Sequence, residues 1–147
     1  MLAPRNDNKN GFGLLEIIIA VAIITGSLVA LAEVSALAVR LTQTALVEHQ
    51  AIFLVEEGAE NARLKRDTDW ATLLASAGTE TIDNMTRATL IEDVYRRDSD
   101  DDIVPASSPD PKTLDPDTKK IMVTVSWEGR EGTMNTSLSA YLTNLFE

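Results

Sequence analysis

The chain has 147 residues and a formal net charge of −10, so we expect no direct binding of nucleic acid. It contains no cysteine, which excludes a disulfide framework and a thiolate zinc site. The length fits one domain, and about 80–100 residues remain for a soluble head once the apolar N-terminal segment is set aside.

An apolar segment at residues 11–39 dominates the N-terminal part of the chain. From Ile17 to Ala32 there are sixteen residues without a charge. An uncharged run of this length is typical of a membrane-spanning helix rather than of a core helix. One carboxylate, Glu16, lies just before it among apolar residues, where an ionisable side chain costs roughly 2.5–3.5 kcal/mol on insertion scales. We therefore expect Glu16 to have a partner of opposite charge.

The residues around Glu16 form a motif. A short polar leader, MLAPRNDNKN, is followed by GFGLLE, and this order resembles the prepilin signal of type IV pilins and type II secretion pseudopilins. The resemblance implies that a prepilin peptidase cleaves between Gly11 and Phe12 and methylates the new N-terminus of Phe12. It also implies that the Phe12 amine pairs with Glu16, within a subunit or between neighbours. The chain departs from the family pattern at Asn10, where a basic residue is usual, and at Gly13, where threonine is frequent.

The charges that flank the apolar segment predict its orientation. Arg5 and Lys9 precede it and the next basic residue is Arg40, so the positive-inside rule places the leader in the cytoplasm and the rest outside. A helix from Phe12 to Glu33 would be about 32 Å long, close to the ~30 Å thickness of a hydrocarbon core. We expect a single pass through a membrane, with Glu33 as a solvated carboxylate at the far interface, and the resemblance implies that this is the bacterial inner membrane.

The helical pattern continues beyond the membrane segment. No proline occurs between Pro4 and Pro105, and apolar residues recur at steps of three, four or seven along one face. These residues are Leu41, Ala45, Ile52, Val55, Ala59 and Ala62. We predict one helix from Phe12 to about Arg66, followed by a short helix at residues 70–77 that residues 67–69 cap and Gly78 ends.

The C-terminal half of the chain has the pattern of strands. A β-rich run from Thr86 to Tyr95 predicts one strand, and apolar–polar alternation predicts two more that the turn EGREG joins. The expected inward residues are Ile121, Val123, Val125 and Trp127, then Met134, Leu138, Ala140 and Leu142. The fold class is therefore α+β, with the outer half of the long helix covering a small antiparallel sheet. This order resembles the minor pilins and minor pseudopilins.

Between the strands, residues 96–120 contain four of the five prolines and seven aspartates, and we predict a turn-rich surface loop there. Asp98, Asp100, Asp101 and Asp102 offer the hard oxygens that calcium prefers. By family resemblance, some pseudopilins bind calcium in a head loop, but the EF-hand spacing is absent. We expect a solvated acidic loop and keep a calcium site at these four aspartates as the alternative.

No catalytic motif is present, so we expect no enzymatic activity. The resemblance implies three parts: a cleaved leader (1–11), a transmembrane and filament-core half of the helix (12–39), and a head outside the cytoplasm (40–147). It implies a structural subunit of a type IV pilus or pseudopilus-like filament. The expected partners are prepilin peptidase, other pilins or pseudopilins, an inner-membrane assembly platform and the lipid bilayer. The alternative is a bitopic membrane protein whose acidic head binds a ligand or calcium, with no filament role.

Overall fold

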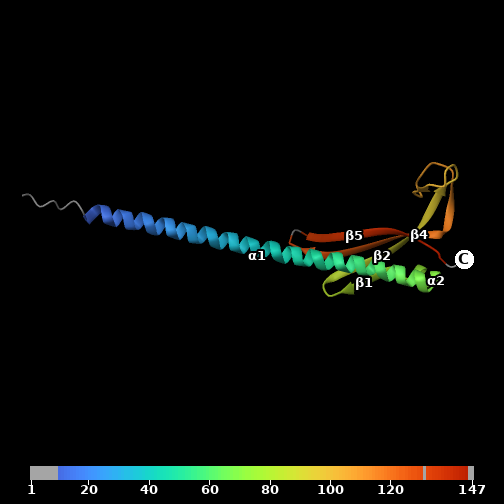
Figure 1. The fold of residues 1–147 in the computed structure, drawn as a ribbon, viewed down its shortest axis with the longest axis horizontal. Helices are drawn as coiled ribbons and strands as arrows, with labels where there is room; N and C mark the ends of the chain where they lie inside the picture. The colour runs from blue at the N-terminus through green and yellow to red at the C-terminus, as the bar shows by residue number, and fades with distance from the viewer. Residues whose placement is uncertain (1–9, 131, 146–147) are drawn as a thin grey trace, which may run out of the picture. The chain divides into compact units, whose positions relative to one another are not determined.

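The structure of the chain is a computed structural model that describes residues 10–130 and 132–145 (Figure 1). The elements in order are α1 (Asn10–Thr68), α2 (Trp70–Leu74), β1 (Gly78–Ile82), β2 (Met85–Arg97), β3 (Ile103–Val104), β4 (Lys112–Gly129) and β5 (Gly132–Thr143). One long helix followed by a five-stranded antiparallel sheet confirms the predicted α+β class. The chain divides into two units, Met1–Leu46 and Val47–Glu147, and the division falls inside α1.

α1 has 59 residues, which confirms the prediction of one helix ending near Arg66. Its composition explains its length, because no proline interrupts it and apolar and small residues fill most of it. Lys65 and Arg66 lie in the last turn, where the helix dipole favours positive charge.

In the second unit, α1 packs on the sheet through small residues. Ala51, Val55 and Ala62 are buried and form one core with residues of the sheet and with Leu73 of α2. The predicted face was right for Val55 and Ala62, whereas Ile52 is 38% exposed. At 100° per residue, Ala51, Val55 and Ala62 span about 40° of the helix circumference and Ile52 lies about 60° beyond them, so the sheet covers it only in part.

The connection from α1 to the sheet is shorter and more regular than predicted. α2 ends at Leu74 instead of Ala77, and Asp69 caps it as expected by accepting a hydrogen bond of 3.0 Å from the N–H of Thr72. Gly78 then begins β1, a strand that the sequence analysis did not predict. β1 pairs with β2 through a two-residue turn in which Asp83 has a φ of 52°.

The strand order is β1-β2-β4-β5, with β3 pairing β2 near its C-terminal end. The β4–β5 hairpin is confirmed, with Gly129 opposite Gly132 at the turn. Of the predicted inward residues, Ile121, Val123, Val125 and Leu142 are confirmed, because they are at most 4% exposed, and Trp127 is partly buried. Met134 and Leu138 are 49% and 41% exposed, so for these two residues of β5 the predicted burial was wrong. Together with Met85 of β2 and Leu142 of β5, the side chains of Ile121, Val123 and Val125 form the core on which α1 packs.

The predicted loop at residues 96–120 was wrong at both ends. Residues 96–97 belong to β2 and residues 112–120 belong to β4, so only 98–111 lie outside these two strands. β4 passes Pro116 by means of an irregularity, in which Oδ1 of Asp115 accepts the N–H groups of Asp117 (3.0 Å) and Thr118 (3.1 Å). Pairing with β5 begins only at Thr118, so Pro116 lies where no strand needs its N–H.

Candidate functional site

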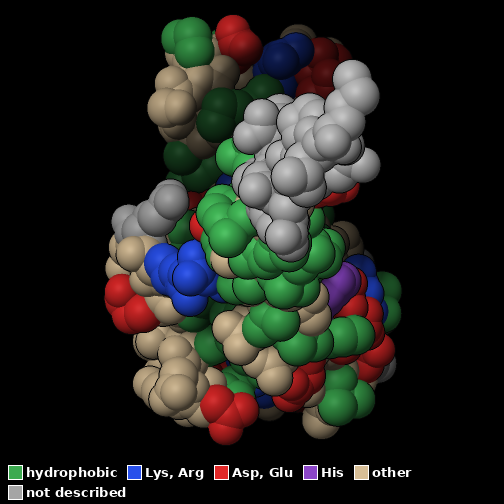
Figure 2. Space-filling view, turned by 90° about the vertical axis from the view of Figure 1, so that its left-hand side faces the viewer, with side chains coloured by type: hydrophobic (Ala, Val, Ile, Leu, Met, Phe, Trp, Pro, Cys, Tyr) green, Lys and Arg blue, Asp and Glu red, His purple; other side chains and the backbone are tan. Residues whose placement is uncertain are grey.

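The first candidate surface is the apolar part of α1. Every described side chain from Gly13 to Leu46 is exposed, and sixteen large apolar side chains in this range are each more than half exposed. Figure 2 shows such side chains gathered around the N-terminal end of the helix. An apolar surface of this size needs a cover. α1 is long and apolar enough to cross a membrane, by length and composition.

Four of the five hydroxyl groups in this part of α1 bond within the helix, the exception being Thr25. Ser27, Ser35, Thr42 and Thr44 each donate to the carbonyl oxygen four residues earlier, at 2.8–3.1 Å. A hydroxyl bonded in this way has its donor satisfied within the helix, so it can lie in an apolar environment such as lipid or packed helices. The apolar surface is therefore also largely free of hydroxyl groups that need an outside partner.

Glu16 is the one carboxylate near the start of this surface. Its side chain is exposed, and within the residues that the structure describes it forms no ion pair. The predicted cleavage site, Gly11 and Phe12, lies in the first turn of α1, while leader residues 1–9 lie outside the described residues. Cleavage, methylation and the pairing of the Phe12 amine with Glu16 therefore stay predictions.

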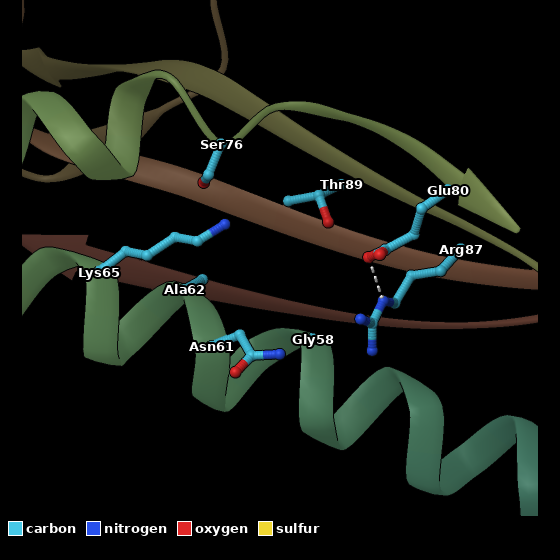
Figure 3. A pocket seen from close by; sticks show the side chains of 8 residues that line it. All are labelled: Gly58, Asn61, Ala62, Lys65, Ser76, Glu80, Arg87 and Thr89. Carbon is cyan, nitrogen blue, oxygen red and sulfur yellow. Dashed lines mark hydrogen bonds and ion pairs between the residues drawn. The ribbon is translucent and has the colours of Figure 1, made fainter. Parts of the chain in front are cut away.

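The second candidate is the point where α1 is fixed to the sheet. Arg87 of β2 is only 5% exposed and points between the sheet and α1 (Figure 3). Its Nε donates to Oε1 of Glu80 in β1 at 2.8 Å, and its Nη1 donates to the carbonyl oxygen of Leu54 in α1 at 3.0 Å. Nη1 also lies 3.5 Å from Oε2 of Glu57. One buried guanidinium thus joins α1, β1 and β2.

A close approach of the helix accompanies this contact. A Cβ added at Gly58 would lie 2.8 Å from Cγ1 of Val123 and 3.1 Å from Cδ of Arg87. Only glycine lets the backbone of α1 lie this near to β4. Beside Gly58 a cavity of about 60 Å³ remains, and its other lining residues are Asn61, Ala62, Lys65, Ser76, Glu80, Arg87 and Thr89. Its polar lining and small volume suit a few water molecules rather than an organic substrate.

The acidic loop is arranged around arginines. Arg97 pairs with Asp100 at 2.8 Å, and its Nε lies 3.2 Å from Asp110 without the geometry of a hydrogen bond. Arg96 pairs with Asp115 at 2.7 Å and more distantly with Asp101 at 3.9 Å. The guanidinium groups of Arg96 and Arg97 therefore occupy the positions beside these carboxylates.

This arrangement does not fit the calcium alternative. Asp98 accepts a hydrogen bond from the hydroxyl of Thr113 at 2.9 Å, and the N–H of Asp102 points to Asp100 at 3.3 Å. In the described parts of the chain, no three carboxylate or imidazole side chains come close enough together to hold one metal ion. Calcium needs six to eight oxygens, so we derive no calcium chemistry from Asp98, Asp100, Asp101 and Asp102.

The pKa values of Asp115 and Arg96 are shifted by the ion pair that these two residues form. Burial by itself would raise the pKa of Asp115, but the hydrogen bonds from Arg96, Thr118 and Asp117 outweigh it and hold the pKa below its ordinary value. The hydrogen bond to Asp115 raises the pKa of Arg96. Each shift belongs to an ion pair that holds strands together, and neither prepares a group for proton transfer.

Comparisons with protein-family models, with curated proteins and with solved structures found no match for this chain. The candidate sites therefore rest on the geometry alone. Sequence reasoning identified the exposed helix and Glu16, and it missed Arg87 and Gly58. A charge at an inward position of the predicted strand at residues 86–95, and a glycine on the apolar face of a helix, were the signals that could have revealed them.

Proposed function

We propose that this chain is a subunit of a type IV pilus or pseudopilus-like filament, because its architecture is pilin-like. A long apolar N-terminal helix continues into a segment that packs on an antiparallel sheet. The observation that carries the proposal is the complete exposure of α1 from Gly13 to Leu46. A bilayer covers such a surface before assembly, and the same segment of neighbouring subunits covers it in a filament.

The two environments make different demands on the helix, and the sequence meets both. A single-pass segment in the inner membrane needs about 20 apolar residues, and the uncharged run from Ile17 to Ala32 supplies most of them. Packed helices need small residues that let backbones approach, and alanines and Gly26 recur along the segment. The head, on the far side of the membrane, then remains outside the apolar layer.

Glu16 has a defined part in this proposal. Cleavage after Gly11 creates a positive amine on Phe12, about 6 Å along the helix axis from Glu16. An unpaired carboxylate among packed apolar helices is costly, and this amine, from the same or a neighbouring subunit, compensates it. Prepilin peptidase therefore acts before assembly, and the assembly platform receives the processed chain.

Two substitutions test the role of Glu16. Glu16→Gln should leave cleavage and membrane insertion intact and lower incorporation into filaments, because the amine of Phe12 loses its partner. Glu33→Gln is the matched control, since it makes the same change in the same helix at the predicted membrane interface, and it should assemble normally. Immunoblots of membranes and of sheared filaments separate insertion from assembly. Equal incorporation of Glu16→Gln and the unaltered chain would refute this role.

Processing is tested separately. Intact-mass analysis of the membrane-extracted protein should show loss of residues 1–11 and one methyl group on Phe12. Gly11→Val should prevent the cleavage, because a side chain obstructs the approach of the peptidase to the backbone. A protein that keeps Met1 as its N-terminus would support the bitopic alternative, a membrane-anchored head without a filament role.

A further inference from the structure

The sheet has two edges whose outer sides are open. In the strand order β1-β2-β4-β5, β1 and β5 are the end strands, and among the described residues no strand pairs with the outer side of either. Figure 1 shows them at opposite sides of the sheet. Open edges present unpaired N–H and C=O groups that accept another strand.

β5 lacks the features that usually protect an edge. Its twelve residues, GTMNTSLSAYLT, include no charged residue and no proline. Met134 is 49% exposed and Leu138 is 41% exposed, both on the face of the sheet that carries α1. Natural edge strands normally carry lysine, proline or a bulge that opposes pairing with another chain. β5 is therefore a long, neutral and receptive edge.

β1 is suited to be the strand that β5 receives. It is five residues long, and its single charge, Glu80, is already paired with Arg87. Successive strands of the sheet are antiparallel, so β1 and β5 of one chain run in opposite directions. A second copy placed beside the first in the same orientation therefore brings its β1 antiparallel to β5.

We propose that β5 of one copy pairs with β1 of the next, joining heads side by side into one continuous sheet. In this contact the strands of successive copies keep the same polarity, and the twist of the sheet turns each copy relative to the one before it. Antiparallel pairing of β5 with β5 would instead turn the second copy upside down. The contact is heterologous, so each copy keeps one open edge for a further copy wherever the rotation between copies does not close a ring. The choice of a second copy rests on the proposed filament function.

The register of the sheet shows which residues of β1 and β5 stand level across it, and a second copy displaced straight across the strands brings these residues together. Ile82 lies level with Met134, because the ladder runs from Ile82 through Met85 and Trp127 to Met134. By the same route Thr81 lies level with Asn135, and residue 79 with residue 137. Placed side by side, two copies thus oppose an apolar pair on the α1 face.

The other face of the new contact is equally compatible. Thr81 would oppose Asn135 and Thr79 would oppose Ser137, so hydroxyl and amide groups meet and no charges of like sign do. Only five residues of β1 take part, so the ladder is short and the contact weak on its own. It becomes effective where copies are concentrated, in a membrane or a filament.

Cysteine cross-linking tests the contact, and the chain is suited to it because it has no cysteine of its own. The full chain with both Thr79→Cys and Ser137→Cys, in membranes and with an added oxidant, should give a ladder of dimers, trimers and higher multimers. Within one chain these positions are separated by three strand spacings, about 14 Å, too far for a disulfide. Between copies they lie about 5 Å apart, within its range.

Three controls sharpen the result. Thr79→Cys alone and Ser137→Cys alone should give no ladder, because neither residue meets itself. Thr79→Cys combined with Thr143→Cys should also give none, because residue 143 is exposed on the same strand but six residues out of register. A ladder of equal strength from the Thr143 combination would show random collision and overturn the proposal. Dimers from Ser137→Cys alone would show pairing of β5 with itself and overturn it too.

A charge exchange provides a second measurement that does not touch the core. Thr81 and Asn135 are both exposed. Both substitutions are made in the chain that carries the cysteine pair. Thr81→Lys with Asn135→Lys should lower the yield of cross-linked multimers at least tenfold, and Thr81→Lys with Asn135→Glu should restore that yield. Equal ladders from both would overturn the proposal. Cross-linking does not require cleavage of the leader, so a negative result would not affect the proposed role of Glu16. Conversely, normal filament assembly by Glu16→Gln would not argue against the contact between β5 and β1.

Discussion

Replacing Gly58 by alanine measures how closely α1 lies on the sheet. The new Cβ would be 2.8 Å from Cγ1 of Val123, a side chain that is 1% exposed and has little rotamer freedom. Alanine is favoured over glycine inside a helix by about 0.5–1 kcal/mol, whereas overpacking a core costs about 1–3 kcal/mol. The steric cost is the larger of the two, so we expect a net loss of about 1–2 kcal/mol.

A double-mutant cycle identifies the contact responsible. Val123→Ala alone should cost about 2 kcal/mol, because it removes buried methyl groups and leaves a cavity. In the chain with both substitutions, the methyl group of the new alanine occupies part of that cavity. The two losses should therefore fail to add, with a coupling of about 1 kcal/mol or more.

The assay is denaturant unfolding of the full chain in detergent, followed by tryptophan fluorescence. Trp70 and Trp127 both pack against the core under α1, so they report on this unit. Gly78→Ala is the control, because a Cβ at Gly78 would have nothing within 4 Å. If Gly58→Ala unfolded at the same or a higher denaturant concentration than the unaltered chain, the close approach described here would be refuted.

Three further predictions follow from the ion pairs. Glu80→Ala should cost about 1–2 kcal/mol although Glu80 is mostly exposed, because it deprives the buried Arg87 of an acceptor; adding Arg87→Met should recover part of the loss in the same unfolding assay. The pKa of Asp115 lies below its ordinary value of 3.8, so its contribution to stability is present above that pH and is lost as the pH falls through the folded pKa. The melting temperatures of the unaltered chain and Asp115→Asn should accordingly differ at neutral pH and converge in acid. Millimolar calcium should leave the melting temperature unchanged. A ligand bound at 100 times its Kd would add about 2.7 kcal/mol to the free energy of unfolding and would raise the melting temperature. A rise that Asp101→Asn abolishes would contradict the arrangement of the loop.

The elements that could be predicted are those with strong local periodicity. α1 follows from the absence of proline and from the apolar stripe, and the β4–β5 hairpin follows from strict alternation on both sides of a glycine-containing turn. The cap at Asp69 was readable because its chemistry involves only residues three positions away. In each case the cause of the structure lies within a short stretch of sequence.

The elements that were missed depend on residues far apart in the chain. β1 has little strand character of its own, and it is extended because it completes the ladder of β2. β4 continues past Pro116 because Asp115 supplies the turn and Arg96, on the neighbouring strand, holds Asp115 in place. No local pattern contains those partners.

The same limit applies to the site at the helix–sheet contact. The role of Arg87 appears only when Leu54, 33 residues earlier, offers its carbonyl oxygen. Glu80 completes the pair from a strand that was itself not predicted. The exposed surface of α1, by contrast, needed no tertiary information, because its length and apolar composition decide it.

The close approach of α1 to Val123 at Gly58 also governs how the second unit responds to force. A pull along α1 loads its contact with β4 in shear, and apolar burial alone resists sliding weakly because it has no direction. Cγ1 of Val123 fills the space that a Cβ would take, so a slide along the axis drives it against the neighbouring turns of the helix, at Val55 and Ala62. Val123, which occupies the space left by the absent side chain, thus resists sliding of α1 along the sheet. Tension on the helix is therefore transmitted to the sheet.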